Sequence, residues 1–171
     1  LLKSILPFEI AVQEIFQVAN DTHARFTATA RTYEYHVIRN KDPFLIGKAW
    51  YNINFPELEK LNKFVGILLE YEDFTSFSKL NTQTFTNNCK IFSAQWTEQY
   101  KGHLVFTIRA DRFLRNMVRA IVGTLLMAAE KDLNENQFRK ILDSKNRSEA
   151  GFSVPAHGLY LTNVEYPFLN K

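Results

Sequence analysis

Hydrophobic and polar residues alternate along five segments of the chain, and a period of two residues predicts β-strands. These segments are residues 9–18, 26–39, 90–99, 103–109 and 159–166. Only Tyr100, Lys101 and Gly102 separate the third segment from the fourth, so these two should form a hairpin. The pattern therefore indicates a sheet in which several neighbouring strands run antiparallel.

Three further segments carry apolar residues at helical spacing. The first helix should begin near Phe55-Pro56-Glu57, because proline and acidic residues favour a first turn, and its apolar face ends at Leu69. The other two helices are expected over residues 113–129 and 133–142, and loops over 40–47, 72–88 and 151–158. The order of elements predicts an α+β fold: a two-layer domain, mostly antiparallel sheet, with helices on one face.

Composition narrows the class of protein. With 171 residues and 46% of them hydrophobic, the chain can bury the core of one domain, which excludes a disordered polypeptide. A net charge of +3 excludes binding to nucleic acid by bulk charge, so any such site needs clustered cations. Cys89 is the single cysteine and the four histidines lack ligand spacing, so we expect no disulfide and no metal site. The sequence shows no membrane span and no signal peptide, which predicts a cytoplasmic protein.

Arginines cluster around the strongest predicted helix. Arg112, Arg115 and Arg119 are spaced i, i+3, i+7 and should share one helix face, with Arg109 just before it. Guanidinium groups suit phosphate and carboxylate ligands. A solvated helix face is the alternative, but most neighbours are apolar and only Asp111 is nearby to pair, which favours anion binding.

A second cluster lies on the predicted strand 26–39 and just before it. Tyr33 and Tyr35 point to the same face, with Arg31 beside them and Arg25 shortly upstream. Aromatic rings flanked by arginine can stack on a nucleobase and hold its phosphate. Ordinary cross-strand aromatic packing is the alternative, and composition alone favours it.

Two loop motifs carry weaker signals. The segment 74–79 combines hydroxyl groups with Lys79 and fits either a phosphate grip or a surface turn anchored by two phenylalanines. Gly158 before the last strand predicts a close approach of two backbones. Phosphate-cradling glycine loops, nucleophile elbows, zinc-binding H-E-x-x-H motifs and paired catalytic acids are all missing from the sequence.

The start of the chain suggests a fragment. Leu1, Leu2, Ile5 and Leu6 sit at helical spacing before Pro7, and no methionine precedes them. This pattern predicts a helix that has been cut, although a trimmed or frayed terminus is the alternative.

Together the motifs resemble the TruA-type tRNA pseudouridine synthase family. The resemblance rests on residues 23–35 (HARFTATARTYEY), 72–77 (EDFTSF), 113–119 (FLRNMVR) with 121–123 (IVG), 155–161 (PAHGLYL) and 164–167 (VEYP). It implies two lobes whose sheets meet at an RNA-binding cleft, and isomerisation of uridine to pseudouridine in the anticodon stem-loop of tRNA, at positions 38–40, without a cofactor. It also implies a homodimer.

The family's essential aspartate lies in a G-R-T-D-x-G-V-H-A motif of the N-terminal lobe, and that motif is missing here; Arg109-Ala110-Asp111 is only a partial likeness. The resemblance therefore implies that residues 1–171 are the C-terminal lobe and are inactive alone. Glu72 stands where many relatives have histidine. Lys90 stands where many have arginine, and lysine keeps the positive charge but lacks the planar two-pronged guanidinium group.

The resemblance also implies roles for individual residues. Tyr33 would stack on the target uracil, Leu159 would form an apolar wall of its pocket, and Arg119 would hold the missing aspartate charged. The arginines expected to contact RNA phosphates are Arg25, Arg31, Arg112 and Arg115. Two alternatives stay open from the sequence: a non-catalytic RNA-binding module, and a structural or oligomerisation domain with no RNA role.

Overall fold

A computed structural model describes residues 5–78 and 85–169 and shows a five-stranded mixed sheet. The strands are β1 (Ala30–Ile38), β2 (Trp50–Tyr51), β3 (Ile91–Tyr100), β4 (His103–Ala110) and β5 (Leu159–Glu165). β1 is central: β4 and then β3 lie on one side, while β5 and β2 share the other side. All pairings are antiparallel except β1 with β2, so the predicted mostly antiparallel sheet is confirmed.

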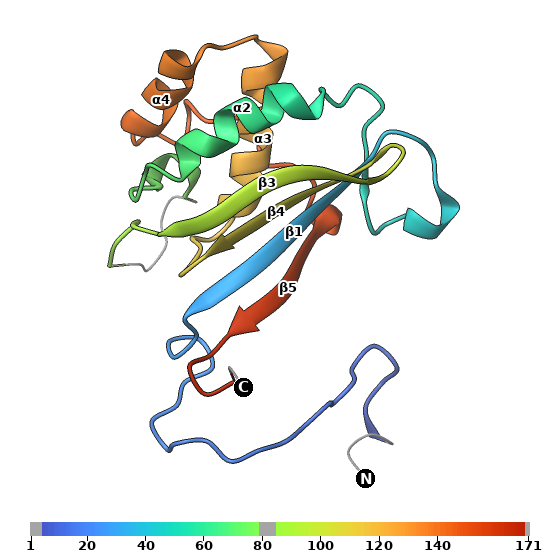
Figure 1. Cartoon of the computed structure of the whole chain (residues 1–171), viewed down its shortest axis with the longest axis vertical. Helices are drawn as coiled ribbons and strands as arrows, with labels where there is room; N and C mark the ends of the chain where they lie inside the picture. Colours follow the sequence, from blue (N-terminus) through green and yellow to red (C-terminus); the bar gives the residue numbers. More distant parts are fainter. Residues whose placement is uncertain (1–4, 79–84, 170–171) are drawn as a thin grey trace.

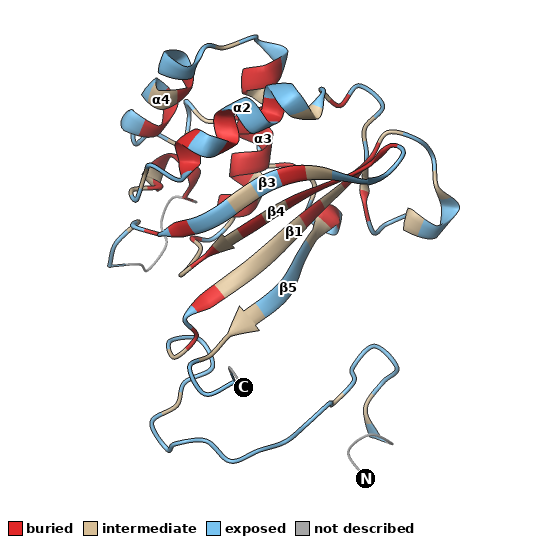
Figure 2. Ribbon diagram, in the orientation of Figure 1, coloured by how far each residue is buried: buried red, intermediate tan, exposed pale blue. Residues whose placement is uncertain are grey.

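The helices cover one face of this sheet (Figure 1). They are α2 (Leu58–Leu68), α3 (Met117–Glu130) and α4 (Glu135–Asp143). Buried residues concentrate between the two layers, where Tyr35 of β1, Phe106 of β4 and Leu125 of α3 are inaccessible to solvent (Figure 2). Each such side chain contributes roughly 1.5–3 kcal/mol of burial free energy. The predicted α+β two-layer class is confirmed.

Local sequence explains how several elements begin and turn. The β3–β4 hairpin turns at Gly102, whose φ of +84° favours glycine and whose backbone N–H donates to Glu98 Oε1 at 2.7 Å. Helix α4 begins at a capping box, in which Asn134 Oδ1 accepts from the backbone N–H of Gln137 at 2.9 Å. The hairpin and all three helices were expected, with boundaries that differ by a few residues.

The helix expected over residues 113–129 begins later, at Met117. Asn116 adopts a left-handed conformation with φ of +72°, and this breaks the helical path before the first turn of α3. Arg112 and Arg115 therefore precede the helix and do not share a helix face with Arg119. That part of the sequence prediction is wrong, because the spacing of the arginines along the chain cannot reveal that the backbone leaves the helical conformation at Asn116.

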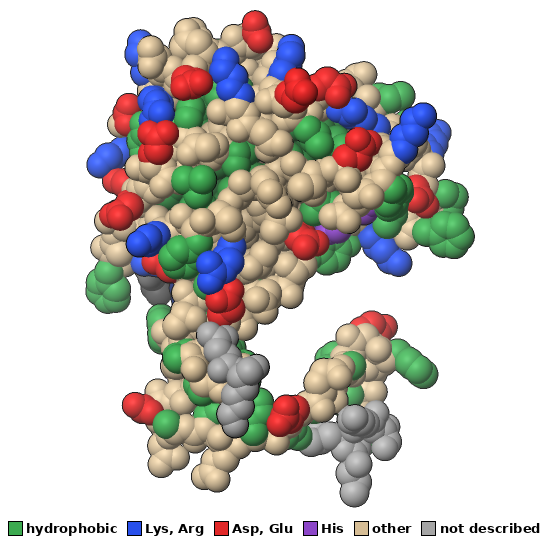
Figure 3. Space-filling view, in the orientation of Figure 1, with side chains coloured by type: hydrophobic (Ala, Val, Ile, Leu, Met, Phe, Trp, Pro, Cys, Tyr) green, Lys and Arg blue, Asp and Glu red, His purple; other side chains and the backbone are tan. Residues whose placement is uncertain are grey.

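The predicted strand over residues 9–18 is also wrong. These residues form no strand, and most of their side chains are exposed, Ile10 and Ile15 among them. The segment lies away from the sheet and helices (Figure 3), and only near its end does a ring contact, between Phe16 and Phe168 with centroids 6.2 Å apart, join it to the described C-terminal residues. The helical layer of the domain carries mixed charges (Figure 3). An alternating segment becomes a strand only when a neighbouring strand accepts its hydrogen bonds, and the described sheet offers none here.

Other outcomes are smaller. The two-residue strand β2, parallel to β1, was not predicted, because two residues carry no periodic signal. The predicted N-terminal helix falls largely on residues 1–4, outside the described residues. Within the described ranges no helix is long and apolar enough to cross a membrane, and no group of three or more His, Cys, Asp or Glu side chains is placed to hold a metal ion.

Candidate functional site

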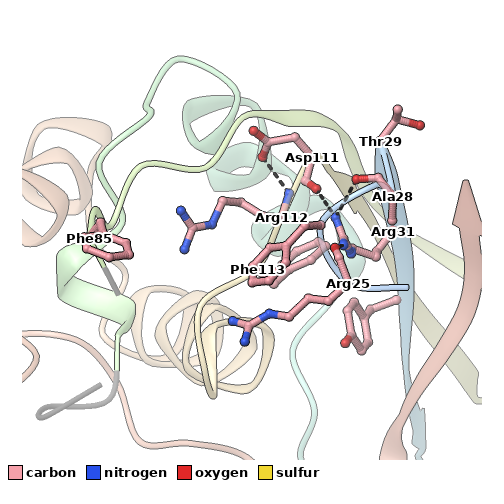
Figure 4. Close-up of a pocket in the computed structure, with 10 residues that line it drawn as sticks. Arg25, Ala28, Thr29, Arg31, Phe85, Asp111, Arg112 and Phe113 are labelled. Carbon is pink, nitrogen blue, oxygen red and sulfur yellow. Dashed lines mark hydrogen bonds between the residues drawn. The ribbon is translucent and has the colours of Figure 1, made fainter. Parts of the chain in front are cut away.

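A cavity of about 590 Å³ opens where the start of β1 meets the end of β4. Three separate segments supply its lining: the loop before β1 with β1 itself, the chain just after β4, and Phe85 (Figure 4). The lining residues are Arg25, Phe26, Ala28, Thr29, Arg31, Tyr33, Phe85, Asp111, Arg112 and Phe113. Register explains the meeting, because Arg31 of β1 lies opposite Ala110 of β4.

Arg31 ties these segments together. Its Nη1 donates to the carbonyl oxygen of Asp111 at 2.6 Å and to that of Ala28 at 3.1 Å, and its Nη2 donates to the carbonyl oxygen of Arg25. A planar guanidinium is suited to such a fork of bonds. Arg31 therefore braces the loop before β1 against the end of β4.

Asp111 is the only acidic residue among the described lining residues, and its carboxylate accepts hydrogen bonds from the backbone. One carboxylate oxygen accepts from the backbone N–H groups of Lys90 at 2.8 Å and Arg112 at 2.6 Å. The side chains of Arg112 and Arg25 extend into the open part of the cavity (Figure 4). The cavity is therefore cationic, which suits an anionic ligand.

Tyr33 forms one wall of the cavity. Its ring meets the ring of Phe113 edge to face, with centroids 5.0 Å apart and an interplanar angle of 82°. Tyr33 is half-buried, whereas Tyr35 on the same strand face is fully buried in the core. The two tyrosines therefore differ: Tyr35 packs in the core, as the alternative of ordinary aromatic packing predicts, and Tyr33 lines a cavity.

Arg119 and Leu159 do not line this cavity, and each lies near Tyr35. Arg119 Nε donates to the carbonyl oxygen of Val154 at 2.5 Å, and the Tyr35 hydroxyl donates to that of Pro155 at 2.8 Å. Burial raises the pKa of Tyr35 well above its usual range, and the nearby charge of Arg119 opposes this effect only in part. Leu159, half-buried, is the register partner of Tyr35 in β5.

The loop over residues 151–158 is held tightly against α3 and β1. A Cβ on Gly123 would collide with the carbonyl of Phe152, and a Cβ on Gly158 would lie 2.8 Å from the carbonyl oxygen of His36. The close approach expected at Gly158 is confirmed, and Gly123 makes a second close contact of the same kind. The loop that accepts the hydrogen bond from Arg119 is therefore rigidly placed.

Two polar side chains brace the same loop. Arg147 donates from Nη1 to the carbonyl oxygen of Gly151 at 2.8 Å and from Nη2 to Ser153 Oγ at 3.0 Å. Asn116 Nδ2 donates to the same Ser153 oxygen at 2.5 Å. No periodicity or motif in the sequence pointed to Arg147 or Ser153.

Of the seven residues expected at a site, Arg25, Arg31, Tyr33 and Arg112 line the cavity together. Arg119 and Leu159 lie near Tyr35 and do not line the cavity. Arg115 is exposed in the turn before α3 and does not line the cavity. Sequence reasoning gave no role to Phe26, although it lies in the motif 23–35, or to Phe85, because exposure to a cavity leaves no pattern along the chain.

Two other candidate features belong elsewhere in the fold. Arg109 forms a two-pronged ion pair with Glu165, with both N–O distances 2.7 Å, so its charge is already matched. In the motif that begins at Phe74, both phenylalanines are fully buried and Ser76 Oγ donates to the carbonyl oxygen of Ile141 at 2.7 Å. This favours an anchored turn over a phosphate grip; Lys79 lies outside the described residues.

Comparison with known proteins decides the family. A family model described as tRNA pseudouridine synthase matches residues 69–167, more than half of the chain. The chain belongs to the tRNA pseudouridine synthase family.

Relatives named tRNA pseudouridine synthase A extend the match. The protein of Bacteroides fragilis is 50% identical over 167 residues and that of Parabacteroides distasonis 51% identical over 170 residues, each match covering 97% of this chain and 66% of the relative. The Bacillus subtilis protein is 36% identical over 171 residues, covering 96% of this chain and 67% of the relative. The chain thus spans about two thirds of the length of these synthases.

Proposed function

We propose that residues 1–171 form the C-terminal lobe of a tRNA pseudouridine synthase. The complete protein isomerises uridine to pseudouridine at positions 38–40 in the anticodon stem-loop of tRNA, and its catalytic aspartate comes from an N-terminal lobe outside this chain. The observation that carries the proposal is the cationic cavity in which Arg25, Arg112 and Tyr33 converge from segments far apart in sequence.

The reaction needs few groups from this lobe. The C1′–N1 bond of the target uridine breaks, the uracil turns over, and a C1′–C5 bond forms while C5 loses a proton and N1 gains one. Tyr33 stacks on the uracil and Leu159 limits the pocket with an apolar wall. Both side chains are half-buried and so keep a surface for a ligand.

Arg119 is proposed to pair with the aspartate of the other lobe. A carboxylate within a cleft stays ionised only when a cation or hydrogen bonds compensate its desolvation. The bond from Arg119 Nε to Val154 aims the guanidinium and leaves its two terminal nitrogens without a partner among the interactions described here.

The phosphate contacts divide between two kinds of arginine. Arg25 and Arg112 extend into the cavity (Figure 4) and Arg115 is exposed in the turn before α3, so these three are proposed to contact the RNA backbone. Arg31 contributes charge, but its guanidinium nitrogens donate to three carbonyl oxygens of the protein. Its main proposed effect is therefore to fix the shape of the site. We also propose that the complete protein acts in the cytoplasm as a homodimer, with one tRNA touching both subunits.

Incubation of the complete protein with unmodified tRNA tests the function. We expect pseudouridine in the anticodon arm by mass spectrometry, and no turnover by residues 1–171 alone. Arg119→Ala should abolish turnover while tRNA binding survives. Arg119→Lys should restore turnover in part, because lysine supplies the positive charge but not the planar guanidinium geometry. Sedimentation of the complete protein tests the dimer.

The outcomes separate the alternatives. RNA binding without any pseudouridine formation by the complete protein would identify a non-catalytic RNA-binding module. A failure to bind tRNA at any salt concentration would refute the RNA role altogether.

A further inference from the structure

We propose that Phe26 and Phe85 are stacking residues that hold unpaired nucleobases beside the target uridine. This inference rests on the proposed function and adds two ligand contacts to it. Both rings line the cavity that contains Tyr33, and both are among the most exposed large apolar side chains described: Phe26 is 75% exposed and Phe85 is fully exposed.

The exposure of Phe26 is built by its own turn. His23 Nδ1 accepts from the backbone N–H groups of Arg25 at 3.0 Å and Phe26 at 3.3 Å, and the backbone N–H of Thr27 donates to the carbonyl oxygen of His23 at 2.9 Å. These bonds close a tight turn whose tip carries the ring outwards. The backbone at residue 26 is therefore fixed rather than free to fold the ring inwards.

Neighbouring side chains prepare the ring for a ligand. The His23 ring lies 4.5 Å from the Phe26 ring, centroid to centroid, and the Arg25 guanidinium carbon lies 5.4 Å from the Phe26 centroid. Arg31 also fixes this loop, because its Nη2 donates a hydrogen bond to the carbonyl oxygen of Arg25. A nucleobase on the free part of the ring would bring its phosphate within reach of Arg25, since stacking and phosphate contacts go together in single-strand binding.

Phe85 approaches the cavity from a different part of the chain. It lies across the cavity from Phe113, and the Arg112 side chain extends from the end of β4 towards it (Figure 4). The cavity is therefore bordered by two exposed rings on separate segments, each with an arginine nearby. Two bases separated from one another fit this arrangement, whereas the bases of an intact duplex present no free faces.

Charge favours RNA over a protein segment as the occupant. Arg25, Arg31 and Arg112 line the cavity, and they outnumber the single carboxylate of Asp111, one oxygen of which accepts from two backbone N–H groups. An apolar protein segment would bury these guanidinium groups without compensating charge, which is costly. An RNA strand supplies a ring for each phenylalanine and a phosphate for each free arginine.

Binding of unmodified tRNA to the complete protein at several salt concentrations tests the proposal. Phe26→Ala and Phe85→Ala should each weaken binding about 5- to 100-fold, as expected for the loss of one stacked base. The slope of log Kd against log salt should not change, because no cation is lost. Arg25→Ala should lower that slope by about one unit. Phe26→Tyr should restore binding.

Phe44→Ala is the matched control, since Phe44 is 85% exposed and lies outside the cavity. It should bind tRNA like the wild type. Wild-type affinity in both Phe26→Ala and Phe85→Ala would overturn the proposal, as would a loss of affinity equal for tRNA and for a fully paired RNA duplex. A lowered melting temperature in Phe26→Ala with unchanged affinity would show that the ring packs against protein instead. If the wild-type protein itself fails to bind tRNA, the proposed function has failed.

Discussion

Arg31 shows how one side chain can determine the shape of a site through its hydrogen bonds to the protein itself. Its guanidinium connects three carbonyl groups, of Arg25, Ala28 and Asp111, which belong to segments more than 80 residues apart. By sequence it was one arginine among several expected at phosphates. The structure distinguishes it from Arg25 and Arg112, whose guanidinium groups extend into the cavity.

Arg31→Ala should lower the free energy of unfolding by about 1–2 kcal/mol, since partly buried carbonyl groups lose a charged donor. It should also weaken tRNA binding because the loop before β1 loosens. Arg31→Lys keeps the charge but cannot bridge three carbonyls, so it should recover little of either property. Urea unfolding and tRNA titration measure the two effects. Full recovery by lysine would mean that charge, not bracing, is what matters.

His103 introduces a pH dependence. Burial lowers its pKa below the ordinary value of 6.5, the charge of nearby His36 lowers it further, and Asp42 acts in the opposite direction. The unfolded chain therefore binds more protons than the folded chain just below pH 6.5, so stability should fall as the pH drops from 7 towards 5. Urea unfolding at both ends of this range measures the change.

His103→Gln should make stability less dependent on pH in that window. His157→Gln, in which an exposed histidine is replaced, is the control and should keep the slope of the wild type. Equal slopes for the wild type and His103→Gln would remove His103 as the cause.

The packing of elements against one another sets the position of Arg119. Helix α3 and the loop over residues 151–158 touch backbone to backbone at Gly123 and Gly151, and Val154 accepts the hydrogen bond from Arg119 where this contact continues. Helix α2 makes no comparable approach, because a Cβ on Gly66 would meet nothing within 4 Å. The two helices should therefore respond differently to the same substitution.

Gly123→Ala should destabilise the domain by about 3 kcal/mol or more, because the new methyl group meets backbone that cannot move aside. Gly66→Ala should instead stabilise it by about 0.5–1 kcal/mol through a better helix propensity. Thermal unfolding of the two variants gives the comparison. Equal melting temperatures would contradict the close packing of the loop on α3.

The domain as a whole leaves one strand-like segment unpaired. Residues 9–18 alternate apolar and polar side chains, and Ile10, Ile15 and Phe16 are exposed. If the proposed second lobe is present in the complete protein, it offers a place where these side chains are buried and their backbone groups paired.

Amide hydrogen exchange tests this arrangement. Residues 9–18 should exchange rapidly in the 171-residue chain and become protected in the complete protein, while β1 is protected in both. Rapid exchange in both proteins would show that the segment is a linker and that its alternating pattern has no structural partner.

Local patterns were enough to predict the elements whose stability is local or between neighbours. The hairpin of β3 and β4, the three helices and the two-layer class follow from periodicity, turn residues and caps that act within about ten residues. The arginine cluster, the tyrosine strand and the family resemblance likewise marked Arg25, Arg112 and Tyr33 as candidates, because residue types suited to phosphates and bases are recognisable without a fold.

What required the folded chain was everything that depends on distant segments meeting. The left-handed turn at Asn116 separates Arg112 from the helix of Arg119, and register places Arg31 beside the end of β4. A segment of alternating apolar and polar residues becomes a strand only if another strand pairs with it. For this reason the segment 26–39 contains strand β1, whereas the segment 9–18 forms no strand. Phe26 and Phe85 gain meaning only from the cavity they share, since exposure and neighbours belong to three-dimensional packing and not to spacing along the chain.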